Sequence, residues 1–188
     1  TSIEELKNHI DKIKKYSKVP ICIDSEGAQV RTSTVPINTV FVDRQTVKLV
    51  SSVKVEKQNQ IGLWPSEVFL QLNQGDIITI DFDSLLLVVT SVGNNNAKAT
   101  VLNGGSVGNN KAVTVFPSVR LPALSDKDIS AIKLGLKHGI KDFALSFANT
   151  AQDVKDLRKI TGNDSRIISK IESKSGVNNL DKILNETD

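Results

Sequence analysis

The sequence predicts an α/β fold into which an all-β domain is inserted. A helical pattern followed by a short apolar run opens the chain, short β-rich stretches fill the middle, and helical and strand patterns alternate again after residue 120. Alternating strands and helices are typical of parallel βαβ units, whereas many short strands separated by turns are typical of a barrel or sandwich. We therefore predict an α/β segment at residues 1–29, an all-β domain at 30–119 and a second α/β segment at 120–188.

The first segment predicts one amphipathic helix and one strand. Apolar residues recur at helical spacing from Ile3 to Ile13, after Ser2 as a candidate N-cap. The apolar run at 19–24 then predicts a fully buried strand. Because Cys22 lies in that run, we expect it to be a buried and unreactive thiol.

The middle segment predicts a small barrel or sandwich. Turns rich in asparagine and glycine separate its short apolar stretches, and these stretches have no helical pattern. Trp64, which precedes Pro65, is expected to pack within this domain. The predicted strands are 39–42, 47–55, 76–80, 85–92, 97–102 and 112–115.

The last segment predicts alternating helices and strands. Ser125 is a candidate N-cap, and Gly139 and Gly162 are candidate helix ends. This order predicts parallel βαβ units. The predicted elements are a helix from Ser125 through His138, a strand at 142–147, a helix at 151–160, a strand at 166–172 and a helix at 177–185.

Composition argues against several classes of protein. The 24 basic and 21 acidic residues are scattered along 188 residues without an arginine-rich run, so nucleic acid is a poor candidate partner. The single cysteine precludes a disulfide within the chain and fits a reducing cytoplasm. The chain has neither a signal-peptide pattern nor a run of about 18 apolar residues, so we expect no membrane association.

Polar residues lie at or just after the end of each predicted strand of the α/β segments. The carboxyl ends of parallel strands often carry functional sites, because the loops there vary over a rigid scaffold. Lys170 and Glu172 are two apart on one predicted strand, so they share a face. A lysine beside a carboxylate fits a site for phosphate and a divalent metal, and it equally fits a structural ion pair. The polar residues are Asp24, Ser25, Ser146, Asn149, Lys170 and Glu172.

Several stretches of the sequence resemble the pyruvate kinase family. The run Arg-Ile-Ile-Ser-Lys-Ile-Glu at 166–172, continued by 176–188, looks like the family's catalytic-lysine strand and the helix after it. Residues 24–32 resemble the strand end that leads into the family's lid domain, and 101–111 resemble the last hairpin of that lid. The stretches that resemble the family's re-entry into its barrel are 121–128, 135–139 and 142–147. Together these matches cover nearly the whole chain in the family's order.

The resemblance implies a fold and a reaction. The fold is a partial (β/α)8 TIM barrel, here three strands with their helices, and an inserted all-β lid barrel. The reaction is that of a phosphotransferase, which moves phosphate from phosphoenolpyruvate to ADP and gives pyruvate and ATP, with Mg2+ (or Mn2+) and K+ as cofactors. The resemblance also implies a homo-oligomer when the protein is intact.

The resemblance assigns roles to particular residues. Lys170 is expected to stabilise the phosphoryl group in flight and to assist the enolate, and Glu172 is expected to bind the divalent metal. Asp24 and Ser25 are expected at the potassium site, with Ser25 where threonine is usual. The residues expected to face the nucleotide phosphates from the lid side are Arg31 and Lys111, which without the resemblance are simply solvated basic residues.

Three departures from the family's pattern suggest a divergent member. Residues 26–29 read Glu-Gly-Ala-Gln where Lys-Gly-Pro-Glu is usual, which reverses a charge at Glu26. Phe82 stands between two aspartates where the family has two adjacent aspartates and a glycine, and Asn149 replaces an arginine.

The resemblance also implies that parts of the family's active site lie outside this sequence. The first two barrel strands and the strand with the second metal-binding aspartate have no counterpart in it, so we expect an internal piece that is inactive alone. Two alternatives stay open. In the first, the chain is a pyruvate-kinase-like binding or regulatory module that has lost catalysis. In the second, only the β-rich domain is stable, and the flanking segments pair between chains through exposed sheet edges.

Overall fold

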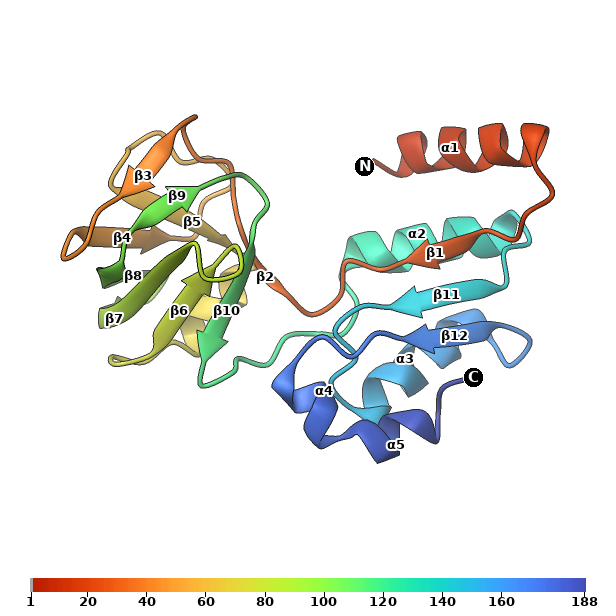
Figure 1. Ribbon diagram of the computed structural model, residues 1–188. Coiled ribbons are helices and arrows are strands. Elements are labelled where there is room, and N and C mark those ends of the chain that lie inside the picture. Colours follow the sequence, from red (N-terminus) through yellow and green to blue (C-terminus); the bar gives the residue numbers. More distant parts are fainter. Residues whose placement is uncertain (1) are drawn as a thin grey trace. The chain divides into compact units, whose positions relative to one another are not determined.

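The computed structural model describes residues 2–188 and divides into two compact units. Residues up to Ala28 together with Pro122–Asp188 form an α/β unit, and Gln29–Leu121 form a β unit. Figure 1 shows the elements of each unit in the order of the chain. None of the helices within 2–188 combines the length and the apolar character needed to cross a membrane.

The helices of the α/β unit begin where the sequence supplies caps. Ser2, Ser125 and Thr150 each accept a hydrogen bond from the backbone three residues on, and the acidic residue at that position bonds back to the cap. The helices are α1 (Ile3–Tyr16), α2 (Asp126–Lys137), α3 (Ala151–Thr161), α4 (Lys174–Asn178) and α5 (Leu180–Leu184).

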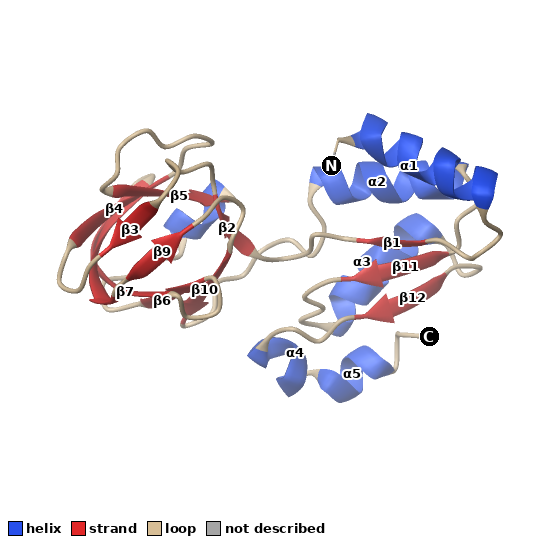
Figure 2. Ribbon diagram, turned by 45° about the horizontal axis from the view of Figure 1, so that its top comes forward, coloured by secondary structure: helices blue, strands red, loops and turns tan. Residues whose placement is uncertain are grey.

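The sheet of the α/β unit has three parallel strands in the order β1-β11-β12, seen side by side in Figure 2. In the register of this sheet, Ile23 lies beside Phe143 and Phe143 beside Ile167. These three residues are buried with apolar side chains of the helices, such as Ile132 on α2. Successive residues of a strand point to opposite faces, so one face of the sheet carries the core and the other is open. The strands are β1 (Cys22–Asp24), β11 (Asp142–Leu145) and β12 (Arg166–Ser169).

Some predictions for the α/β unit were wrong. The strand predicted at 19–24 is not fully buried, because only Ile23 is buried, Ile21 is partly buried against the same core, and Cys22 is exposed on the open face. The strands predicted at 142–147 and 166–172 end earlier, at Leu145 and Ser169. The helix predicted at 177–185 is two short helices, α4 and α5.

The β unit is a closed barrel of seven strands in the order β10-β2-β5-β4-β8-β7-β6, with a separate two-stranded sheet of β3 and β9. All neighbouring pairs in the barrel are antiparallel except β4 and β5. The strands are β2 (Val30–Thr32), β3 (Thr39–Phe41), β4 (Thr46–Val50), β5 (Gln60–Trp64), β6 (Ile77–Ile80), β7 (Leu85–Gly93), β8 (Asn96–Asn103), β9 (Gly105–Val107) and β10 (Ala112–Phe116).

Alternation of apolar residues builds the barrel core. Buried side chains alternate along β7 from Leu85 to Val89 and along β8 from Ala97 to Val101, and the remaining residues of both strands are not buried. Strands β2, β5 and β9 were not predicted, and a short 3-10 helix at Ser66–Leu70 also falls in the middle segment. The prediction for Trp64 was wrong, because its side chain lies at the end of β5 and 46% of the residue is exposed.

Candidate active site

The carboxyl ends of the three parallel strands lie at one edge of the sheet and bring three charged side chains together. Lys170 Nζ donates a hydrogen bond to Asp24 Oδ2 at 2.9 Å and lies 3.9 Å from Glu172 Oε1. The structure therefore unites three of the residues singled out from the sequence. Lys170 and Glu172 follow the end of β12, so the prediction that they share a face of that strand was wrong, although their side chains do meet.

Two buried serines fix the loop after β1. The Ser146 backbone N–H donates to Ser25 Oγ at 3.0 Å, and Ser146 Oγ lies 2.6 Å from the carbonyl oxygen of Ser25. Ser146 Oγ also lies 3.0 Å from Asp24 Oδ1. The Asp24 carboxylate thus has one oxygen held by a serine and the other by Lys170.

A strained backbone residue orients Glu172. The N–H of Phe147 donates to Glu172 Oε2 at 3.0 Å, and Phe147 has a φ of 51°, in the left-handed region that bulky residues rarely adopt. Strain of this kind persists only where the surrounding structure holds it, and it is common at functional sites. The hydrogen bond fixes one carboxylate oxygen and leaves Oε1 facing Lys170.

The three charged groups are partly open to solvent. The exposed fraction of the side chain is 34% for Lys170, 57% for Asp24 and 38% for Glu172. One ammonium and two carboxylates carry a net negative charge, which attracts a cation, and with a divalent cation bound to a carboxylate the ammonium can stabilise an anionic phosphoryl group. Only a small net contribution to stability is expected from such exposed pairs.

The donor set fits hard cations. Asp24, Ser25 and Glu172 offer only oxygen atoms, which are the ligands that Mg2+ prefers. Within residues 2–188 there is no group of three or more His, Cys, Asp or Glu side chains placed to hold a metal ion.

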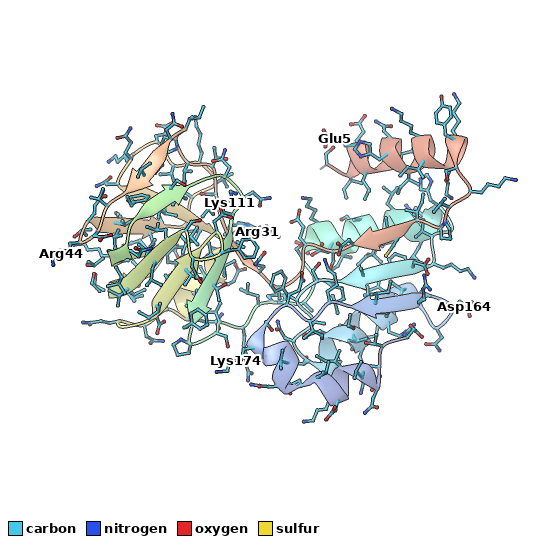
Figure 3. All side chains as sticks on the ribbon, viewed as in Figure 1. Glu5, Arg31, Arg44, Lys111, Asp164 and Lys174 are labelled. Carbon is cyan, nitrogen blue, oxygen red and sulfur yellow. The ribbon has the colours of Figure 1, made fainter. Side chains whose placement is uncertain are left out.

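Arg31 and Lys111 lie next to each other in the β unit, where Figure 3 labels both. Arg31 Nη1 donates to the carbonyl oxygen of Asn110 at 3.3 Å, and the Lys111 ammonium pairs with Asp81 Oδ2 at 2.9 Å. Asp81, Phe82 and Asp83 form a turn in which all three have positive φ, and Phe82 is 93% exposed. The Phe82 departure thus places an exposed aromatic ring beside the Lys111 pair.

The other two departures have structural partners. The Glu26 carboxylate forms an ion pair with Lys127, so the reversed charge at this position is neutralised within the α/β unit. The side-chain Oδ1 of Asn149 accepts a hydrogen bond from Ser173 Oγ, and the backbone carbonyl oxygen of Asn149 accepts one from Asn179 Nδ2 at 2.9 Å. Asn149 therefore ties the start of α3 to the region of α4.

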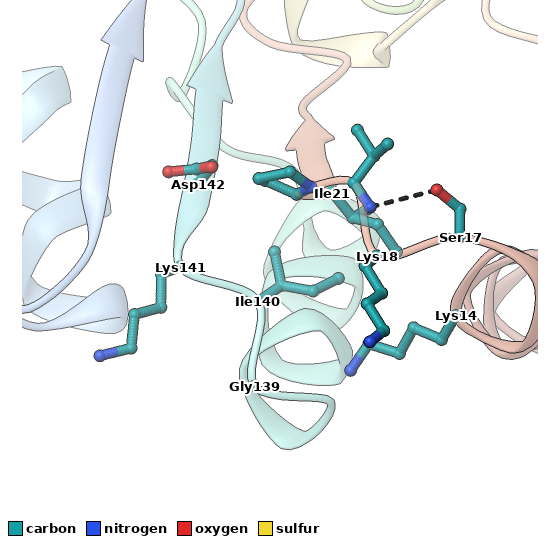
Figure 4. A pocket seen from close by; sticks show the side chains of 10 residues that line it. Lys14, Ser17, Lys18, Ile21, Gly139, Ile140, Lys141 and Asp142 are labelled. Carbon is teal, nitrogen blue, oxygen red and sulfur yellow. Dashed lines mark hydrogen bonds between the residues drawn. The ribbon is translucent and has the colours of Figure 1, made fainter.

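Two cavities lie in the α/β unit. A cavity of about 330 Å3 is found near the amino ends of the strands, where Lys14, Lys18, Gly139 and Lys141 are among the lining residues (Figure 4). A second cavity of about 260 Å3 reaches the candidate site, because Asp24 lines it. The other residues that line this second cavity include Leu6, Glu26, Lys127 and Asp128.

Sequence reasoning singled out Ser146 but missed the other supporting residues of the site. The backbone N–H of Phe147 has no signal in the sequence, because any residue other than proline carries one. Asp128 could have been found, because Ser125 and Asp128 have the spacing of a capping box. The bond that Asp128 accepts from the backbone N–H of Glu26, at 2.7 Å, could not have been found from the sequence.

The chain is similar in sequence to known proteins along nearly its whole length. The family model described as "Pyruvate kinase, barrel domain" matches residues 1–188. The chain is 32% identical to a pyruvate kinase of Sporosarcina psychrophila over 198 aligned residues, which cover 98% of this chain and 34% of the relative. It is 34% identical to a pyruvate kinase of Candida albicans, over 95% of this chain and 37% of the relative.

The chain spans about a third of the length of the curated relatives that it matches. The match extends over nearly all of the chain, including both the α/β unit and the β unit. The chain therefore belongs to the pyruvate kinase family.

Proposed function

We propose that this chain forms part of the catalytic core of a phosphotransferase that moves phosphate from phosphoenolpyruvate to ADP, giving pyruvate and ATP. The observation that carries the proposal is the position of Lys170, whose ammonium lies between Asp24 and Glu172 at the carboxyl ends of parallel strands. That edge is where enzymes of α/β architecture build their active sites.

Lys170 acts on the phosphoryl group. In the proposed reaction the bond from phosphorus to the enol oxygen breaks, a bond to a terminal oxygen of ADP forms, and the enolate left behind takes up a proton to become pyruvate. Negative charge is spread over the phosphoryl oxygens during this transfer, and a fixed ammonium stabilises it. The ion pair with Asp24 directs the Lys170 ammonium at this edge of the sheet.

The carboxylates and the serine hold cations. Glu172 is the proposed ligand of Mg2+ or Mn2+, a cation that offsets charge on the substrate phosphate when it is bound. Asp24 and Ser25 are the proposed ligands of K+. The bonds from Phe147 to Glu172 and from Ser146 to Asp24 keep these oxygens in place before any cation arrives.

The remaining parts of the proposal concern the intact protein. The three-stranded sheet is proposed to be part of a (β/α)8 barrel at residues 1–29 and 120–188, and the β unit, at 30–119, to be its lid. Arg31 and Lys111 are proposed to contact the nucleotide phosphates; Lys111 has to leave Asp81 to do so. A homo-oligomer in the cytoplasm belongs to the same proposal.

The test is a pyruvate assay on the intact protein. Formation of pyruvate from phosphoenolpyruvate and ADP is coupled to lactate dehydrogenase, in Mg2+ or Mn2+ and in K+, and each cation is then omitted in turn. We expect activity that requires both cations. An intact protein that binds phosphoenolpyruvate or ADP without turnover would instead establish the alternative, a binding or regulatory module.

A further inference from the structure

Asp128 is a buried carboxylate with no role in the proposed chemistry. Only 3% of the residue is exposed. Burial of a carboxylate is unfavourable unless hydrogen bonds satisfy it. Asp128 is satisfied by three donors: the N–H of Glu26 at 2.7 Å, the N–H of Ser125 at 3.0 Å and the hydroxyl of Ser125 at 2.8 Å.

These bonds serve two different purposes. The two bonds from Ser125 belong to the capping box of α2, and the N-terminal cap of this helix is complete with them. The bond from Glu26 is additional, because it reaches a residue 102 positions away, in the loop that follows β1. The two carboxylate oxygens divide this work, Oδ2 for the helix cap and Oδ1 for the loop.

The loop held by Asp128 contains Ser25 and directly follows Asp24, the last residue of β1. On one side the loop is fixed to Ser146, through the bond from the Ser146 N–H to Ser25 Oγ. Gly27 also packs so closely on Ser146 that a Cβ built there would lie 2.3 Å from the Ser146 carbonyl oxygen. On the other side the loop is fixed by Asp128, so the segment is held from β11 and from α2 at once.

We propose that Asp128 is a positioning residue for the monovalent cation site formed by Asp24 and Ser25. This inference rests on the proposed function, because it assumes that these two residues bind K+. A carboxylate that orients a ligand segment raises cation affinity without touching the cation, and loss of such a support typically lowers affinity by about 10- to 100-fold.

The experiment compares Asp128→Asn with Ser125→Ala in the intact protein. Asparagine has one accepting oxygen where Asp128 has two, so it can accept from Glu26 or from the Ser125 N–H but not from both. Exchange of the Glu26 amide shows which bond is lost, and Asp128→Ala, which has no side-chain oxygen, takes the place of Asp128→Asn if asparagine keeps the Glu26 bond. Ser125→Ala removes the cap hydroxyl but leaves Asp128 bonded to Glu26. We expect Asp128→Asn to raise the K+ concentration for half-maximal activity by about 10- to 100-fold. The Ser125 variant is expected to lose helix stability and to keep the K+ requirement of the wild type.

A second readout does not depend on activity. Addition of K+ should raise the unfolding temperature of the wild type, relative to tetramethylammonium at equal ionic strength, and this rise should shrink in Asp128→Asn. In hydrogen exchange, the Glu26 amide should be protected in the wild type and in Ser125→Ala, and should exchange faster in Asp128→Asn.

The outcomes separate this inference from the proposed function. If the wild type makes no pyruvate but K+ raises its unfolding temperature in an Asp128-dependent way, the function fails and the positioning role stands. If the Glu26 amide loses protection while the K+ requirement and the K+ effect on unfolding stay unchanged, Asp128 is only structural and the inference is overturned. If Asp128→Asn does not fold, Asp128→Glu is the second variant. Glutamate is common at this position of a capping box, but its longer side chain displaces the carboxylate from the Glu26 N–H. The same rise in the K+ requirement is expected for it.

Discussion

Lys170 reaches across β11 to Asp24, a residue 146 positions earlier in the chain, and donates to its carboxylate at 2.9 Å. Asp24 ends β1 and Lys170 follows β12, and these two strands are not neighbours because β11 lies between them. On the side of β11, the hydroxyl of Ser146 contacts the same carboxylate at 3.0 Å. The site therefore depends on all three strands keeping their register.

Replacement of Glu172 by glutamine should weaken binding of the divalent cation. Glutamine keeps an oxygen that accepts the Phe147 N–H but lacks the charge that binds a cation. The Mg2+ concentration for half-maximal activity should rise by about tenfold or more. Glu186→Gln, which removes the partner of Lys155 away from the site, is the matched control and should leave the Mg2+ requirement unchanged. Equal Mg2+ requirements in the two variants would show that Glu172 is not a ligand of the divalent cation.

Replacement of Gly27 by alanine should be more harmful than the same change at Gly139. Both glycines have positive φ, 74° and 71°, so each alanine has to adopt a left-handed backbone at a cost of about 1 kcal/mol. Only at Gly27 does the added Cβ meet another atom, the Ser146 carbonyl oxygen at 2.3 Å, whereas nothing lies within 4 Å at Gly139. Urea unfolding should show an additional loss of about 1–3 kcal/mol for Gly27→Ala. Equal losses would show that the loop is not packed against Ser146 in solution.

Two phenylalanines of the β unit should differ sharply in their contribution to stability. Phe69 is 2% exposed within the barrel core, so Phe69→Ala should lower the free energy of unfolding by about 3–5 kcal/mol. Phe82 is 93% exposed, so Phe82→Ala should change it by less than about 0.5 kcal/mol. Denaturant melts of the two variants measure both values. A large loss for Phe82→Ala would mean that this ring is covered in solution.

The Cys22 thiol should be accessible but slow to react at neutral pH. Partial burial raises the pKa of this thiol, and the negative charges of Asp142 and Asp24 raise its pKa further. A raised pKa leaves less thiolate at neutral pH, so alkylation should become fast only at a higher pH than for an ordinary cysteine. Iodoacetamide labelling of the 188-residue chain across about pH 6–10, followed by mass spectrometry, gives the midpoint, which is the pH at which the alkylation rate is half its maximum. The urea-unfolded chain is the control, and a native midpoint at or below the unfolded one contradicts the prediction.

The pattern of residues was sufficient for the elements with strong local signals. The helix starts at Ser2 and Ser125 and the long strands of the barrel were predicted because caps and alternating apolar residues are local features. Strand β2, only three residues long, and strand β9, which begins at Gly105, carry too little pattern to be recognised. The exposure of Cys22 was missed because an apolar run does not say how many faces of its sheet are covered.

The charged centre of the site and Ser146 were predictable, but the other supports were not. Lys170, Glu172 and Asp24 stand in local stretches that follow strands, so the topology of a parallel sheet brings them together. The supporting bonds join segments far apart in the chain, such as Glu26 with Asp128. Bonds of this kind depend on the packing of helices against loops, which no spacing in the sequence encodes.

The most direct measurement is the rate of pyruvate formation by the intact protein with Lys170→Met, compared with Lys155→Met. Methionine keeps much of the length of the side chain but has no charge, and Lys155 lies on α3, where it pairs with Glu186. We expect Lys170→Met to lower kcat by about 10²- to 10³-fold or more, and Lys155→Met to leave it within about twofold of the wild type. A Lys170→Met enzyme with the kcat of the wild type would contradict the assignment of phosphoryl transfer to this site.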